Sequence, residues 1–128
     1  MSEGEKHHQA AVQAIRALQQ HVRWKPNKEA QHLAKRQLMG HLPGEATADD
    51  YHARIGVVLH EAHSLVYHYP FSAKDYYAVS GRVDGVVWLV IFGADGILET
   101  AFPPRNPDDY LTKRGFVLLG RLGDMAHE

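Results

Sequence analysis

The stretch Val86-Val87-Trp88-Leu89-Val90-Ile91-Phe92 is the strongest indication of a buried strand in this 128-residue chain, because it is continuously apolar and consists almost entirely of β-branched and aromatic residues. A strand open to water on one face alternates apolar with polar side chains, and this one does not. We therefore expect a central strand that is covered on both faces. Three alternatives could cover its faces: helices on each side, the C-terminal segment or a second subunit.

Three further extended segments flank this strand. Residues 65–69 and 76–80 precede it and residues 97–102 follow it, with turn signals at Asp84-Gly85 and at residues 94–96. Connections this short join antiparallel neighbours, so the pattern predicts a four-stranded antiparallel meander.

Ahead of the strands, apolar residues recur at helical spacing in three spans, residues 5–24, 28–39 and 48–62. Asn27 is the expected cap of the second helix, and Thr47 opens a capping-box pattern at the third. The predicted fold class is α+β, with N-terminal helices followed by the antiparallel meander.

The length favours one domain over residues 1–128. Within it we distinguish an N-terminal helix (1–26), two helices (27–63), the antiparallel sheet (64–102) and a C-terminal segment (103–128). The C-terminal segment is open between one helical turn followed by a fifth strand and one followed by a short helix.

The composition excludes several classes of protein. The chain has no cysteine, which rules out disulfide scaffolds, thiolate catalysis and Cys-ligated zinc. No apolar run reaches the roughly 20 residues of a membrane helix, and the N-terminus lacks a signal-peptide pattern. We expect a cytoplasmic protein with no membrane partner.

The net charge of -1 conceals an asymmetry between the two parts of the chain. Residues 1–42 carry seven basic and three acidic side chains (+4), whereas residues 43–128 carry seven basic and twelve acidic ones (-5). A cationic helical segment can meet a nucleic-acid backbone, dock on an acidic protein or simply solvate a helix surface.

The sequence lacks several motifs of known catalytic and cofactor-binding sites. The chain has no Gly-x-Ser-x-Gly elbow and no Walker or dinucleotide-binding loop, so no nucleotide cofactor is expected. His60 and His63 are three residues apart, which does not match the zinc-helix signature. Because a zinc site needs further ligands, such as His52 or His68, we assign no metal residue and leave metal binding by these four histidines open.

A different set of residues suits metal-independent cleavage of RNA. That reaction needs a base for the 2′-hydroxyl, a cation for the phosphate and an acid for the leaving oxygen. The candidates are polar residues at helix-to-sheet junctions. Those for catalysis are His32, His41 and Thr100, and those for phosphate or substrate binding are Lys35, Arg36, Arg54 and Tyr77.

The run from His32 to Phe102 resembles the barnase/EndoU/colicin E5–D/RelE-like nuclease superfamily, in particular its phage- and toxin-associated branches. The resemblance rests on a histidine-bearing helix (32–36), a His-Pro-like turn (41–43), a further helix and a meander that ends in Glu99-Thr100-Ala101-Phe102. It implies an acid/base role for His32 or His41, phosphate contacts from Lys35, Arg36 or Arg54, and a phosphate-side hydroxyl on Thr100.

Two functions follow as expectations. The first is a small ribonuclease-like domain that cleaves RNA phosphodiesters without a metal or cofactor, and which is toxin- or mobile-element-associated. The second is a non-enzymatic module of the same fold that oligomerises or binds a protein partner through its sheet.

Overall fold

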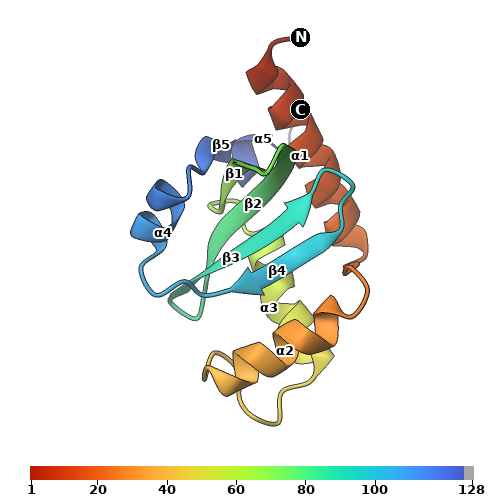
Figure 1. Cartoon of the computed structure of the whole chain (residues 1–128), viewed down its shortest axis with the longest axis vertical. Coiled ribbons are helices and arrows are strands. Elements are labelled where there is room, and N and C mark those ends of the chain that lie inside the picture. The colour runs from red at the N-terminus through yellow and green to blue at the C-terminus, as the bar shows by residue number, and fades with distance from the viewer. Residues whose placement is uncertain (126–128) are drawn as a thin grey trace.

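Five strands form one antiparallel sheet in the computed structural model, which describes residues 1–125. The strands are β1 (Leu65–Phe71), β2 (Lys74–Val83), β3 (Val86–Gly93), β4 (Leu98–Phe102) and β5 (Val117–Arg121). Their spatial order is β4-β3-β2-β1-β5 (Figure 1). The α+β class is confirmed, whereas the prediction of four strands in a meander is corrected by the presence of β5.

The fifth strand pairs with β1 at the edge of the sheet farthest from β4. Leu65 lies opposite Arg121 and His68 opposite Val117, with a bulge between Val66 and Tyr67. Without β5, the backbone donors and acceptors of β1 on that side would lack a partner in the sheet. Of the two alternatives for the C-terminal segment, a fifth strand or a short helix, the structure shows that residues 117–121 form a strand.

Helices α1 (Glu3–Gln20), α2 (Lys28–Leu38) and α3 (Ala48–His60) precede the sheet, and α4 (Pro107–Lys113) and α5 (Leu122–Met125) flank β5. Within residues 1–125 no helix is both long enough and apolar enough to cross a membrane.

All three N-terminal helices end before the predicted residue, α2 at Leu38 instead of 39 and α3 at His60 instead of 62. Helix α1 ends four residues before the predicted residue 24, because the chain becomes extended and the Arg23 carbonyl accepts a hydrogen bond from Leu98 N at 2.8 Å. Asn27 precedes α2 in the left-handed conformation (φ 67°), and its side chain makes no cap hydrogen bond. The capping box of Thr47 and Asp50 at α3 is confirmed.

Strand β3 is covered on both faces, as its apolar sequence predicted. Trp88, Val90 and Phe92 are buried in the main core with residues of α1 and α3. Leu89 and Ile91 point to the other face and pack in a second cluster that includes Leu111 of α4. The C-terminal segment therefore supplies the second cover as it crosses the sheet between β4 and β5 (Figure 1).

Candidate functional site

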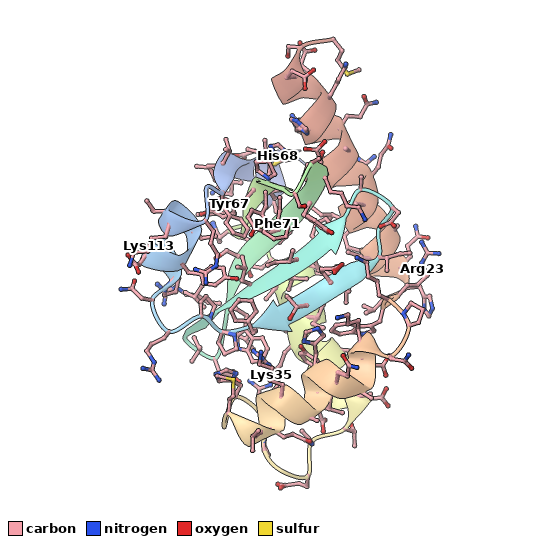
Figure 2. The ribbon with its side chains drawn as sticks, in the orientation of Figure 1. Arg23, Lys35, Tyr67, His68, Phe71 and Lys113 are labelled. Carbon is pink, nitrogen blue, oxygen red and sulfur yellow. The ribbon has the colours of Figure 1, made fainter. Side chains whose placement is uncertain are left out.

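A cleft of about 940 Å³ opens between α2, the end of β4 and the segment that enters α4. Five of the seven residues singled out in the sequence line it: His32, Lys35, Arg36, His41 and Thr100. The first three share one side of α2, because residues three and four apart on a helix are neighbours. Figure 2 labels Lys35 on this helix, next to β4.

The imidazole of His32 is held from two sides. Its Nδ1 lies 3.3 Å from the Thr100 hydroxyl on β4, and its ring stacks on Trp24 at 5.8 Å between centroids. Burial lowers the pKa of His32, and the nearby cations Lys28, Arg36 and Lys35 lower it further. The ring is therefore mainly neutral at neutral pH and free to accept a proton.

Arg36 is a buried cation that has no counter-ion in the described part of the chain. Its side chain is only 3% exposed, and its guanidinium lies over the ring of Phe102 at 5.4 Å. Within residues 1–125 no carboxylate pairs with it, and its Nε has no hydrogen-bond partner. Burial lowers the pKa of Arg36, but arginine keeps its charge in proteins. An unpaired buried charge of this kind is costly unless a ligand compensates it.

His41 lies just beyond α2, where its backbone N–H donates to the Arg36 carbonyl at 2.8 Å. Its Nδ1 is buried and has no hydrogen-bond partner among the described residues. Burial and the charge of Arg36 lower the pKa of His41. A negatively charged ligand beside Arg36 would have the opposite effect on this imidazole and favour its protonated form.

Sequence reasoning missed two cations of the cleft, Arg105 and Arg114. Arg114 lies over the ring of Tyr110 at 3.8 Å. Among the described residues that line the cleft, Asp109 is the one carboxylate, and it pairs with Lys113 at 3.1 Å. No local motif marks these arginines, because only the crossing of α4 over the sheet brings them towards α2.

The structure does not bring the other two candidates, Arg54 and Tyr77, to this cleft. Arg54 lines a separate hollow of about 490 Å³ beside α3, with its guanidinium 5.8 Å from the Trp88 ring. Tyr77 is 2% exposed and pairs across the sheet with Phe92, which belongs to the main core. Thr100 instead pairs with Ile91, whose side chain lies on the α4 face.

His52, His60, His63 and His68, the four possible metal ligands of the sequence analysis, do not form one cluster in the structure. His52 accepts a hydrogen bond from Trp24 Nε1 at 2.9 Å, and His63 lies 3.2 Å from Arg121 Nη1. Within residues 1–125, His52, His60 and His63 join no cluster of metal-ligand type, whereas His68 does.

Comparison of this chain with protein-family models, with curated proteins and with solved structures gives no match. The cleft is therefore interpreted from its own geometry. It combines four cations, a neutral imidazole next to a hydroxyl, and aromatic rings. This arrangement suits a ligand that carries phosphate.

Proposed function

We propose that the cleft between α2, β4 and α4 binds an RNA phosphodiester and cleaves it without a metal ion. The observation that carries the proposal is the buried Arg36, whose guanidinium has no carboxylate partner within residues 1–125 and lies in the same cleft as the His32–Thr100 pair. A phosphate group is a suitable counter-ion for such a guanidinium. The planar guanidinium presents several N–H donors, and two of them can form paired hydrogen bonds to two oxygens of the tetrahedral phosphate.

The remaining charges of the cleft support the same class of ligand. Lys35, Arg105 and Arg114 add three more cations, while Asp109, the one carboxylate among the described residues that line the cleft, is paired with Lys113. The half-buried rings of Phe102 and Tyr110 provide surfaces on which a base can stack.

In the proposed reaction His32 acts as the general base. When its Nδ1–H donates to the Thr100 hydroxyl, Nε2 keeps its lone pair and can take the proton of the ribose 2′-hydroxyl. The 2′-oxygen then forms a bond to phosphorus as the bond from phosphorus to the 5′-oxygen breaks. Arg36 stabilises the negative charge on the pentacoordinate phosphorus group.

His41 is the proposed general acid. The bound phosphate, next to Arg36, favours the protonated form of His41, which then gives its proton to the departing 5′-oxygen. The products are a 2′,3′-cyclic phosphate and a free 5′-hydroxyl, and one proton has moved from the 2′-oxygen to His32 for each proton given by His41.

Cleavage of a single-stranded RNA in the presence of EDTA tests this mechanism. We expect a cyclic phosphate product, no cleavage when the 2′-hydroxyl at the scissile position is replaced by hydrogen, and a rate about 10²–10⁴ lower for His32→Ala. His60→Ala is the matched control, because His60 is an exposed histidine at the end of α3. A His32→Ala protein that cleaves as fast as the unmodified one would refute the assignment.

A second candidate function, a non-enzymatic module that binds a partner through the sheet, has its own observation. Val117 and Leu118 on the edge strand β5 are 53% and 56% exposed, and Phe71 at the end of β1 is 57% exposed. RNA that binds without being cleaved, together with a dimer that Leu118→Glu dissolves, would favour this function over the nuclease.

A further inference from the structure

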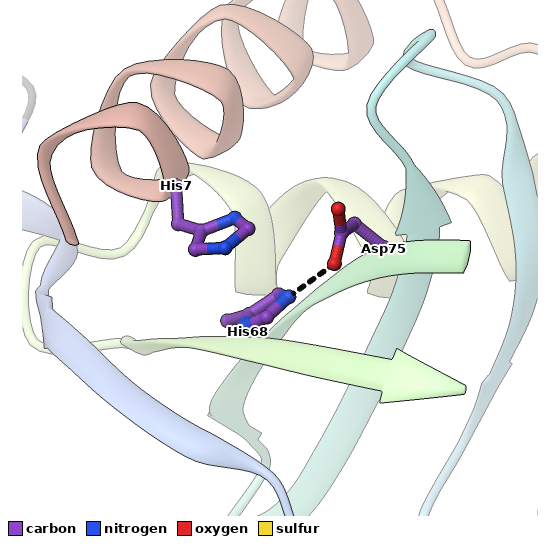
Figure 3. Close-up of side chains that lie close together, drawn as sticks. All are labelled: His7, His68 and Asp75. Carbon is purple, nitrogen blue, oxygen red and sulfur yellow. Dashed lines mark hydrogen bonds and ion pairs between the residues drawn. The ribbon is translucent and has the colours of Figure 1, made fainter. Parts of the chain in front are cut away.

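Three metal-ligand side chains from separate elements meet near the N-terminal end of α1. His7 comes from α1, His68 from β1 and Asp75 from β2 (Figure 3). One ligand atom from each lies within 4.8 Å of the other two. His68 Nε2 and Asp75 Oδ1 are 2.7 Å apart, and the rings of His7 and His68 stack with their centroids 3.7 Å apart.

The fold holds this cluster in place. His68 lies opposite Tyr77 in the β1–β2 pairing, and Asp75 lies opposite Pro70 close to the turn of the same hairpin. The side chains of His7 and His68 are only 18% and 12% exposed, although neither belongs to the apolar core. The hairpin and α1 therefore hold two imidazoles and a carboxylate close together at a site outside the apolar core.

We propose that His7, His68 and Asp75 form a binding site for one divalent transition-metal ion, with zinc as the best-suited ion. Two imidazoles and a carboxylate are common zinc ligands, and neutral imidazole also binds the neighbouring transition metals. Glu3 lies one helical turn before His7, with Oε2 3.8 Å from His7 Nε2, and is placed to supply the fourth ligand.

Tyr77 has the role of an outer partner in this site. Its hydroxyl lies 2.7 Å from His7 Nδ1. A phenol is neutral at neutral pH, so the Tyr77 oxygen can accept the Nδ1–H of His7. That bond selects the tautomer whose Nε2 carries a lone pair, which is the usual way in which an outer partner orients a metal-bound histidine.

Metal binding requires a small rearrangement. Zinc at about 2.0–2.1 Å from nitrogen places neighbouring tetrahedral ligand atoms roughly 3.3 Å apart. His68 Nε2 and Asp75 Oδ1, now 2.7 Å apart, must therefore separate slightly, and the ligand atom of His7, which lies within 4.8 Å of both, must take up the same spacing. The nearly parallel rings, inclined by 18°, must also rotate so that their in-plane lone pairs converge. Rotation about the bond between Cβ and the ring is soft, and the metal replaces the proton shared by His68 and Asp75.

The site is independent of the proposed nuclease cleft. Tyr77 pairs with Phe92, which belongs to the core shared with α1 and α3, whereas Thr100 pairs with Ile91 on the α4 face. A bound ion would join the start of α1 to the β1–β2 hairpin. Its expected effect is therefore on stability, since a ligand that binds only the folded chain raises the melting temperature.

Calorimetric titration of the chelator-treated full chain with zinc tests the proposal. We expect one equivalent to bind, about 10–100-fold weaker binding for Tyr77→Phe, and a loss at least as large for His68→Ala or Asp75→Asn. His60→Ala is the matched control for the other histidines of the chain and should bind as the unmodified protein does. With cobalt in place of zinc, the visible spectrum of the unmodified protein should show tetrahedral coordination.

A second measurement covers the case in which His68→Ala folds poorly. Asp75 is exposed at 55% of its side chain, so Asp75→Asn should fold normally. Zinc should raise the melting temperature of the unmodified and His60→Ala proteins but not that of Asp75→Asn. If zinc does not bind, or if it binds and stabilises all variants equally, the site does not exist, whatever the outcome of the RNA assay.

Discussion

Replacing Arg36 by methionine should change stability and ligand binding in opposite directions. Arg36 is 3% exposed and has no carboxylate partner among residues 1–125, and its guanidinium lies over the ring of Phe102 with Nη2 4.0 Å from Met39 Sδ. Burying an ion costs several kcal/mol, and a cation–π contact returns about 0.5–2 kcal/mol. Methionine keeps the length and flexibility of the side chain without its charge, so the free energy of unfolding should rise by about 1–2 kcal/mol.

The same change should weaken binding of a phosphate-bearing ligand. Hydrogen bonds from a charged donor contribute about 1.5–3 kcal/mol each, which corresponds to a factor of roughly 10–150 in the dissociation constant. A suitable ligand is a short single-stranded RNA analogue that lacks the 2′-hydroxyl at the scissile position, because it binds without being cleaved.

Urea unfolding and calorimetric titration of the same protein samples measure the two effects. Arg54→Met is the matched control, since Arg54 lies over Trp88 in a separate hollow and its removal should leave ligand binding unchanged. An Arg36→Met protein that is destabilised by more than about 1 kcal/mol, and that binds the ligand as before, would show that the guanidinium is a structural group and not an anion site.

The remaining predictions concern pH and two glycines. Because burial lowers the pKa values of His32 and His41, the unfolded chain binds more protons than the folded one below the ordinary histidine pKa of about 6.5. The free energy of unfolding should therefore fall as the pH drops through this range. It should fall less steeply in a His32→Gln, His41→Gln double variant, and equal slopes in urea titrations would contradict the assignment. Gly81→Ala should destabilise by about 1–3 kcal/mol, since its Cβ would collide with the buried Ser64 side chain, which donates to a carbonyl of α3 at 2.8 Å. Gly56→Ala inside α3 meets no atom within 4 Å and should stabilise by about 0.5–1 kcal/mol, so thermal unfolding of the two alanine variants should shift in opposite directions.

Local sequence patterns were sufficient to predict most of the helices and strands. Helix α3 begins where its capping box predicts, and β3 occupies the apolar run, because capping bonds and side-chain periodicity act over a few residues. The end of α1 was misplaced for the opposite reason. Residues 21–24 have an acceptable helical pattern, but the carbonyl of Arg23 pairs with Leu98, which is far away in the sequence.

The candidate site was only partly predictable. His32, Lys35 and Arg36 were identifiable because helical spacing alone places them on one side of α2. Tyr77 does not line the cleft, and its polar hydroxyl gave no indication of which face of the sheet it occupies. The cluster of His7, His68 and Asp75 has no sequence spacing that marks it, because its members belong to three elements that meet only after folding.

The α+β class, the three N-terminal helices and the burial of β3 on both faces could all be inferred from the order of residues along the chain. These properties follow from periodicity, caps and turns, which depend on neighbouring residues. The packing of α4 on the second face of the sheet and the pairing of β5 with β1 follow instead from contacts between segments far apart in the sequence. Tertiary packing also buries Arg36 with no carboxylate partner among residues 1–125, and it brings Arg105 and Arg114 to the same cleft. Burial and charge balance depend on which distant segments pack together, so the properties that suggest function emerge only when the chain has folded.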